Sequence, residues 1–165
     1  MILYPKAYFN NVREICYEFL KENNINAVVL DVDNTLIDYD RNLPEETIIW
    51  ANELKQKGIK LYILSNTNKK EKVETVSKKM GIPYIGFAKK PLKGGFRKVK
   101  KLLDEDYQNI AVVGDQIFTD VLGANRCNMF AILVEPVGKK DMILTKVKRP
   151  IEQLIKKKYF KKIGR

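Results

Sequence analysis

The chain contains no histidine among its 165 residues. This absence excludes Ser-His and Cys-His nucleophile pairs, and it excludes every metal site that depends on imidazole. Any hydrolytic chemistry must therefore use carboxylates, hydroxyls, lysine and a metal bound by oxygen atoms. The only two cysteines, Cys16 and Cys127, lie far apart and match neither metal-binding nor redox spacing, so we expect reduced, structural thiols.

Long apolar segments are also missing. No uncharged apolar stretch approaches the roughly 20 residues that a membrane span requires. The first residues, MILYPKAYFNN, lack the basic region, apolar run and cleavage site of a secretory signal. We therefore expect a cytoplasmic protein. The length and the 45% hydrophobic content predict one domain over residues 1–165 with a real core.

The net charge of +11 is unevenly distributed. Residues 139–165 carry eleven Lys/Arg and two acids, a net of +9, which leaves +2 for residues 1–138. This basic tail also carries an apolar pattern at helical spacing, made of Ile151, Leu154, Ile155 and Tyr159. Two interpretations fit: a basic amphipathic helix in peripheral contact with an anionic membrane, or a helix packed on the sheet with its lysines in water.

Short apolar runs suited to buried strands alternate with helical patterns along the chain. Strands of this kind joined by helices predict right-handed crossovers and a parallel sheet of about five strands. The predicted class is a three-layer α/β fold with a catalytic core over about 26–135. An apolar stripe before the first strand predicts an N-terminal helix over 9–23, packed on the sheet. The expected strands are 27–30, 61–64, 84–87, 110–113 and 130–134, and the expected helices between them are 45–57, 69–80, 95–103 and 119–125.

Polar residues follow four of these strands at the point where each strand ends. In open parallel sheets, ligands bind beyond the carboxyl ends of the strands. Each group alone has a simpler explanation, since Ser65-Asn66 could cap a helix, Lys90 could be solvated and Gly114-Asp115 could form a turn. Their order on successive strands points instead to one site. The candidate residues are Asp31, Asp33, Thr35, Ser65, Asn66, Lys90, Asp115 and Asp120.

This set resembles the four motifs of the haloacid dehalogenase (HAD) superfamily over Ala27–Val134. The motifs are Asp31-x-Asp33-x-Thr35, Ser65-Asn66, Lys90-Pro91 and Gly114-Asp115-x4-Asp120. The DVDNT and GDQIFTD stretches resemble subfamily IIIA and its YqeG-type group, which includes phosphatidylglycerophosphate phosphatases. The resemblance implies a Rossmann-like fold and Mg²⁺-dependent hydrolysis of a phosphate monoester. An acid at position 33 favours a phosphatase, because members that dehalogenate or pump ions typically lack it.

The resemblance also implies a role for each residue. Asp31 would attack phosphorus and form an aspartyl-phosphate. Asp33 would protonate the leaving oxygen and later take a proton from water. Mg²⁺ would be held by Asp31, the backbone carbonyl of Asp33 and Asp115, with Asp120 beside it through water or a contact to a ligand. The phosphate oxygens would be held by Thr35, Ser65, Asn66 and Lys90, with Lys89 and Lys93 as alternatives to Lys90, which is preferred because the family's lysine commonly precedes proline.

The spacing between motifs leaves no room for a cap domain. Only 29 residues separate Thr35 from Ser65 and 22 separate Thr67 from Lys90, and one helix with its connections uses up each gap. An uncapped site suits a macromolecule or a lipid headgroup at a membrane. The resemblance favours a lipid headgroup phosphate such as phosphatidylglycerophosphate.

Two other classes of protein remain open. The first is an RNA- or ribosome-associated binding factor that uses the basic tail electrostatically, with vestigial or secondary phosphatase activity. The second is a response-regulator-like receiver, although that design phosphorylates an aspartate on a later strand, where this chain offers Gly86-Phe87-Ala88. A P-loop nucleotidase is excluded because no GxxxxGK[ST] stretch exists.

Overall fold

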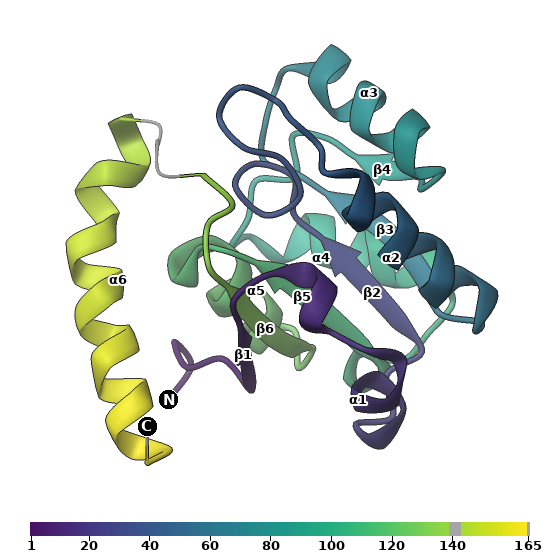
Figure 1. Cartoon of the computed structure of the whole chain (residues 1–165). Coiled ribbons are helices and arrows are strands. Elements are labelled where there is room, and N and C mark those ends of the chain that lie inside the picture. Colours follow the sequence, from purple (N-terminus) through teal and green to yellow (C-terminus); the bar gives the residue numbers. More distant parts are fainter. Residues whose placement is uncertain (139–142, 165) are drawn as a thin grey trace.

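The computed structural model describes residues 1–138 and 143–164, so residues 139–142 and 165 of the expected basic tail lie outside it. Its centre is a parallel sheet in the order β1-β6-β5-β2-β3-β4 (Figure 1). The predicted three-layer α/β class with a parallel sheet is confirmed, but the sheet has six strands and not about five. The strands are β1 (Ala7–Phe9), β2 (Ala27–Leu30), β3 (Lys60–Leu64), β4 (Tyr84–Ile85), β5 (Ile110–Gly114) and β6 (Phe130–Val134).

The additional strand replaces part of the expected N-terminal helix. Residues 7–9 form β1, which pairs with β6, and the helix α1 (Tyr17–Glu22) begins only after Cys16. A 3-10 turn, Val12–Glu14, lies between them. The predicted helix over 9–23 is therefore shorter than expected, since only 17–22 form α1, and β1 was missed because a three-residue strand is too short to produce an alternating pattern. Cys16 is exposed, Cys127 is buried, and both are free thiols.

Helices cover both faces of the sheet. On one face α1 is joined by α2 (Glu45–Gln56) and α3 (Lys70–Met80), and the other face carries α4 (Lys93–Leu103) and α5 (Leu122–Arg126). Alternate residues of β2 enter the two cores, with Val28 and Leu30 in the first and Ala27 and Val29 in the second. A strand buried on both faces needs apolar side chains throughout, which explains the continuous apolar runs.

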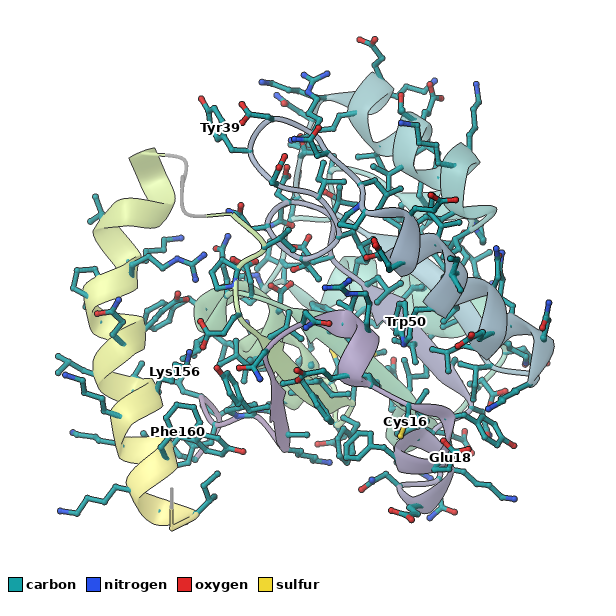
Figure 2. All side chains as sticks on the ribbon, in the orientation of Figure 1. Cys16, Glu18, Tyr39, Trp50, Lys156 and Phe160 are labelled. Atoms are coloured by element: carbon teal, nitrogen blue, oxygen red, sulfur yellow. The ribbon has the colours of Figure 1, made fainter. Side chains whose placement is uncertain are left out.

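One tryptophan ties α2 to the N-terminal segment. Trp50 is only 6% exposed, and its indole N–H donates to the carbonyl oxygen of Ile15 at 2.9 Å. Figure 2 shows Trp50 inside the molecule, on the side of the sheet that α2 covers. This bond satisfies a donor whose burial would otherwise be costly.

The last helix, α6 (Ile143–Lys162), stands beside β1 and β6 at the edge of the sheet (Figure 1). Its inner side packs through aromatic rings, since Tyr159 lies 5.8 Å from Tyr4 and Phe160 lies edge-on to Tyr8 at 4.9 Å, measured between ring centroids. Lys156 and Phe160 point from the helix toward the sheet in Figure 2. The predicted helical spacing in the tail is thus confirmed between 151 and 159.

The apolar residues of α6 do not form one face. Tyr159 is buried and Ile155 packs partly against the second core, whereas Ile151 and Leu154 are 54% and 60% exposed. Val147, one turn before Ile151, is 74% exposed and extends this outer stripe. Among the residues that the structure describes, no helix combines the length and apolar character needed to cross a membrane.

Candidate active site

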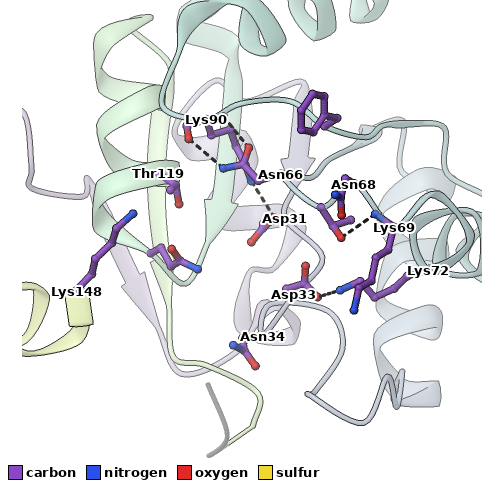
Figure 3. A pocket seen from close by; sticks show the side chains of 13 residues that line it. Asp31, Asp33, Asn34, Asn66, Asn68, Lys69, Lys72, Lys90, Thr119 and Lys148 are labelled. Atoms are coloured by element: carbon purple, nitrogen blue, oxygen red, sulfur yellow. Dashed lines mark hydrogen bonds and ion pairs between the residues drawn. The ribbon is translucent and has the colours of Figure 1, made fainter. Parts of the chain in front are cut away.

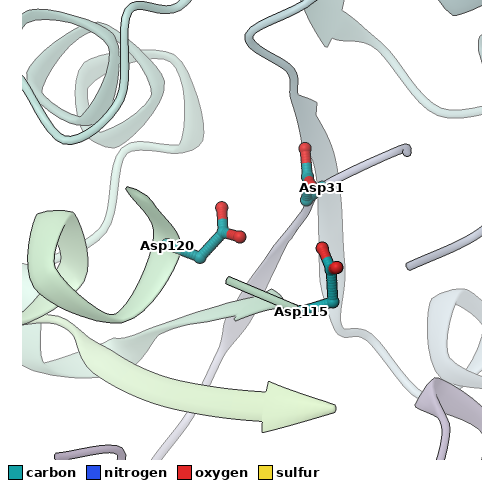
Figure 4. Close-up of side chains that lie close together, drawn as sticks. All are labelled: Asp31, Asp115 and Asp120. Carbon is teal, nitrogen blue, oxygen red and sulfur yellow. The ribbon is translucent and has the colours of Figure 1, made fainter. Parts of the chain in front are cut away.

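Three carboxylates meet at the carboxyl end of the central strands. Asp31 directly follows β2 and Asp115 directly follows β5, and these two strands are neighbours in parallel register, with Leu30 opposite Val113. One carboxylate oxygen each from Asp31, Asp115 and Asp120 lies within 4.8 Å of the others, and all three residues are buried (Figure 4). Residues that are far apart in the sequence therefore form one compact acidic cluster.

Asp120 reaches this cluster because of the local shape of the chain after β5. It lies on a wide π-helical turn, Ile117–Val121, and its Oδ2 accepts from the backbone N–H of Gln116 at 3.3 Å. A Cβ atom on Gly114 would lie 2.1 Å from Asp120 Cγ. Only glycine can therefore occupy the end of β5 while Asp120 keeps this position.

Lys90 lies between two of the carboxylates. Its Nζ is 2.8 Å from Asp31 Oδ1 and 2.7 Å from Asp120 Oδ1, and the residue is 6% exposed. Burial alone would lower the pKa of Lys90, but Asp120 and Asp31 outweigh it and raise that pKa above its usual value, so the ammonium stays charged. Lys89, by contrast, is exposed and lies 5.0 Å from the ring centroid of Phe87.

Asn66 holds the backbone of Lys90 from both sides. The Lys90 N–H donates to Asn66 Oδ1 at 2.6 Å, and Asn66 Nδ2 donates to the Lys90 carbonyl at 3.0 Å (Figure 3). Together these bonds use one of the two N–H donors and one of the two lone pairs of the amide group, so the second N–H of Asn66, which lines the pocket, can still meet a phosphate. In this structure Asn66 thus orients Lys90.

The Asp115 carboxylate contacts an arginine of α6. Arg149 Nη2 lies 2.5 Å from Asp115 Oδ2, and its Nη1 donates to the Asp115 carbonyl at 3.0 Å. Thr35 Oγ1 donates to the other carboxylate oxygen, Oδ1, at 3.4 Å. The contact of Arg149 with Asp115 was not among the sequence predictions.

The cluster is short of positive charge. Burial raises the pKa of Asp31 to about 7, against the lowering effect of Lys90, and Asp120 raises it further. Burial, followed by the charge of Asp31, likewise raises the pKa of Asp115 well above its ordinary range, although Arg149 lowers it. Ionised carboxylates this close and this buried favour a bound cation. A set of hard oxygen donors without sulfur or imidazole fits Mg²⁺.

Asp33 lies apart from the cluster. Its carboxylate Oδ1 is 2.5 Å from Nζ of Lys72, a residue of α3. Asn34, the next residue, has a φ of 59°, a left-handed conformation that asparagine tolerates better than most residues, and this turns the chain after β2. Figure 3 shows Asp33 at the pocket beside Lys72, with Asp31 above it in this view.

These residues line a pocket of about 390 Å³ at the strand ends. Asp31, Asp33, Asn66 and Lys90 contribute to its wall, and three further lysines line it: Lys69, Lys72 and Lys148. In Figure 3, Lys148 of α6 lies across the pocket from Lys69 and Lys72. The pocket therefore carries more positive charge than the predicted motifs supply.

Two of the predicted phosphate-binding residues do not line the pocket. Thr35 is 1% exposed and faces Asp115. Ser65 is fully buried, and its Oγ accepts from the backbone N–H of Thr67 at 3.2 Å. The simpler explanation of Ser65-Asn66 as a helix cap is wrong, because α3 begins at Lys70 after Lys69 and has no side-chain cap.

Sequence reasoning missed Lys72, Lys148, Arg149 and Glu152. Lys72 is one of several lysines near the start of α3, and Lys148 is one of eleven cationic residues in the tail, so composition cannot single them out. The pair Arg149 and Glu152 had a faint signal. Glu152 is one of only two acids between 139 and 165, and it lies three residues after Arg149, at a helical spacing.

The fold and the order of these strand-end residues define the class of protein, a HAD-type hydrolase. The chain superposes on the cobalt-bound form of a deoxy-D-mannose-octulosonate 8-phosphate phosphatase from Haemophilus influenzae with a TM-score of 0.57, over 84% of this chain and 91% of that one, at 16% identity. An identity this low shows the likeness of fold alone.

Sequence comparison gives the particular family. The family model described as mitochondrial PGP phosphatase matches residues 1–138, and the chain belongs to this family. It is 38% identical over 152 residues to a protein of Bacillus subtilis (strain 168) named probable phosphatase YqeG, covering 92% of this chain and 88% of that protein. The chain is 25% identical to phosphatidylglycerophosphate phosphatase 1, chloroplastic/mitochondrial, of Arabidopsis thaliana, of which it spans 48%. The chain is therefore a phosphatase of the HAD type.

Proposed function

We propose that the chain hydrolyses a phosphate monoester with Mg²⁺ through an aspartyl-phosphate on Asp31. The observation that carries this proposal is the position of Asp31. Asp31 lies at the wall of the pocket, and one of its carboxylate oxygens is within 4.8 Å of an oxygen of Asp115 and an oxygen of Asp120. Lys90 Nζ is 2.8 Å from Asp31 Oδ1. A nucleophilic carboxylate, a fixed cation and oxygen donors for a metal are the groups that phosphoryl transfer requires.

The proposed reaction has two displacements at phosphorus. Asp31 attacks phosphorus, the bond to the leaving oxygen breaks, and Asp33 gives that oxygen a proton. Water then attacks the aspartyl-phosphate, Asp33 takes a proton from it, and inorganic phosphate and free Asp31 result. Lys90 stabilises the charge on the phosphate oxygens in both steps. Mg²⁺, held by Asp31, Asp115 and the backbone carbonyl of Asp33, would neutralise the charge of the phosphoryl group.

Replacing the two aspartates tests this division of roles. Asp31→Asn should abolish turnover because it removes the nucleophile and a metal ligand together. Asp33→Asn should turn over very slowly but still form a phosphoryl adduct from a substrate with a good leaving group, since only proton transfer is impaired. Turnover of p-nitrophenyl phosphate with Mg²⁺ and with EDTA, and mass spectrometry of the quenched protein, would measure both effects. Substantial turnover by Asp31→Asn would disprove the covalent route.

We further propose that the substrate is a lipid headgroup phosphate such as phosphatidylglycerophosphate, reached by peripheral contact with an anionic membrane. The names of the family and of the plant relative support this substrate. The outer face of α6 supports the contact, because Val147, Ile151 and Leu154 are exposed on it and Lys158 and Lys161 continue it at helical spacing. Near an anionic leaflet each lysine contributes roughly 1 kcal/mol, which makes a bilayer the fitting occupant of this face.

Exposed isoleucines allow a matched test of this contact. The double variant Ile151→Ser with Leu154→Ser should bind phosphatidylglycerol vesicles about 10- to 100-fold more weakly, because two apolar side chains no longer enter the lipid. Ile49→Ser is the control, since Ile49 on α2 is 51% exposed, close to the 54% of Ile151. Activity on vesicle-borne phosphatidylglycerophosphate should fall, whereas activity on p-nitrophenyl phosphate should not.

Two outcomes would contradict the membrane proposal. Equal losses on both substrates would indicate that the outer face of α6 is structural. Preferential binding of the wild type to RNA over anionic vesicles would favour the alternative, an RNA- or ribosome-associated factor.

A further inference from the structure

The last helix is bonded to the loop that carries Asp115 through two side chains one turn apart. Arg149 donates to Asp115 twice, to the backbone carbonyl at 3.0 Å and to carboxylate Oδ2 at 2.5 Å. Glu152 accepts from the backbone N–H of Phe118 at 3.1 Å and lies 3.5 Å from Arg149 Nη1. α6 thus contacts both ends of the loop from Asp115 to Phe118.

The burial of these groups distinguishes them from the other charges of α6. The side chains of Arg149 and Glu152 are 16% and 6% exposed, and that of Asp115 is 0% exposed. Ionised groups taken out of water destabilise a protein unless they are paired and hydrogen-bonded. A helix that only needed to pack on the sheet could carry apolar residues at these two positions with equal or greater stability.

The geometry of the contact restrains one rotation in particular. A guanidinium is planar, and its two terminal nitrogens donate in fixed directions. Because one nitrogen engages the carbonyl of Asp115 and the other engages its Oδ2, the side chain cannot rotate without breaking a buried bond. On Asp115, Arg149 donates to carboxylate Oδ2, and Oδ1, which accepts from Thr35 at 3.4 Å, keeps acceptor capacity.

We propose that Arg149 is a positioning residue, which orients the Asp115 carboxylate for metal binding from a helix that docks on the catalytic loop. This inference rests on the proposed Mg²⁺ site. It adds a residue that the four motifs do not contain, since α6 lies beyond the residues 1–138 that the family model matches. The opposite role for Arg149 is competition, in which its positive charge occupies Asp115 in place of the metal. The two roles predict opposite changes in Mg²⁺ affinity.

Calorimetric titration of the full chain with Mg²⁺, without substrate, distinguishes the positioning role of Arg149 from the competing role. Arg149→Met should bind Mg²⁺ about 10- to 100-fold more weakly, the usual effect of removing a group that orients a metal ligand. Arg149→Lys should fall between this variant and the wild type, because lysine keeps the charge but loses the planar fork. Lys157→Met is the matched control, since it removes one charge from an exposed position on the same helix and should bind as the wild type does.

A second readout is the Mg²⁺ concentration that gives half-maximal turnover of p-nitrophenyl phosphate. In Arg149→Met it should rise by the same factor, while kcat at saturating Mg²⁺ stays close to the wild-type value. A merely structural role would instead lower kcat, or the folded fraction, at every Mg²⁺ concentration.

Unchanged or tighter Mg²⁺ binding by Arg149→Met would overturn the inference, the latter in favour of competition. If circular dichroism shows that Arg149→Met does not fold, Arg149→Lys decides: weaker binding supports the positioning role and wild-type binding overturns it. A wild-type chain that binds no Mg²⁺ would overturn the proposed function, and this inference with it. Normal binding by the wild type and by Arg149→Met would remove the inference alone.

Discussion

The two halves of the carboxylate cluster receive their positive charge from different parts of the chain. Asp31 and Asp120 share Lys90, whose side chain is 2% exposed and which follows β4 at the edge of the same sheet. Asp115 meets Arg149, which is 16% exposed and belongs to the last helix. The first charge is delivered by the sheet itself, because parallel strands end at one edge. The second depends on the docking of α6 against the sheet.

The largest effect should follow from removing Lys90, the cation that Asp31 and Asp120 share. Lys90→Met should lower kcat on p-nitrophenyl phosphate about 100- to 1,000-fold, as expected for the loss of a preorganised group that stabilises transition-state charge. It should change the Mg²⁺ requirement less than Arg149→Met does. Lys89→Met is the control and should keep wild-type kcat, because Lys89 is exposed and lies over Phe87. A kcat for Lys90→Met near that of Lys89→Met would show that the two halves do not differ as described.

An intermediate effect is expected on stability when metal is removed. The folded-state pKa of Asp31 is about 7 against an ordinary 3.8, so the folded chain binds a proton more tightly than the unfolded chain between these values. Asp31 should therefore reduce the stability of the metal-free protein as pH rises through this window. The melting temperature in EDTA, measured from about pH 5 to about pH 8, should fall more in the wild type than in Asp31→Asn.

The same pH dependence of stability is expected for Asp115, the carboxylate that Arg149 contacts. The pKa of Asp115 is also raised, so Asp115→Asn should flatten the pH dependence in the same direction. Mg²⁺ should reverse the trend in the wild type, because it binds the ionised carboxylates. If the wild type and both variants lose stability in parallel in EDTA, the cluster is not the source of the pH dependence.

The smallest effect should follow from Glu152→Gln. Burial raises the pKa of Glu152, so ionising it in place is unfavourable, and a glutamine keeps the oxygen that accepts from the Phe118 N–H. The free energy of unfolding should change by no more than about 1 kcal/mol, measured by urea denaturation against the exposed control Glu53→Gln. A loss of about 3 kcal/mol or more would show that the Arg149–Glu152 pair is a main anchor of α6.

The sheet was largely predictable because its central strands are buried on both faces. A run such as Ala27–Leu30 must be apolar throughout, and such runs mark five of the six strands. β1, with three partly buried residues, was missed, whereas β4, with two partly buried residues, lies within the apolar run predicted over 84–87. The sequence left open which side of α6 the sheet covers, since helical spacing identifies a helix but does not say which of its apolar residues will be buried.

The predicted candidate residues were found where polar groups interrupt apolar strands, and the parallel topology brings Asp31, Asp115 and Lys90 together. Contacts made by helices were not predictable in this way. Arg149 reaches Asp115 across 34 residues, and its partner depends on how α6 docks. Ser65 shows the complementary case, because its position at a strand end was correct but its hydroxyl closes a turn.

Trp50 is the single tryptophan of the chain, and excitation that the eight tyrosines do not absorb selects its fluorescence. Its indole is buried and hydrogen-bonded to Ile15, so its emission reports on the contact between α2 and the segment that leads into α1. Loosening of that contact would let water reach the ring and move the emission to longer wavelength. No residue would need to be labelled, and intrinsic fluorescence could follow the unfolding of this side of the sheet separately from the release of α6, which carries no tryptophan.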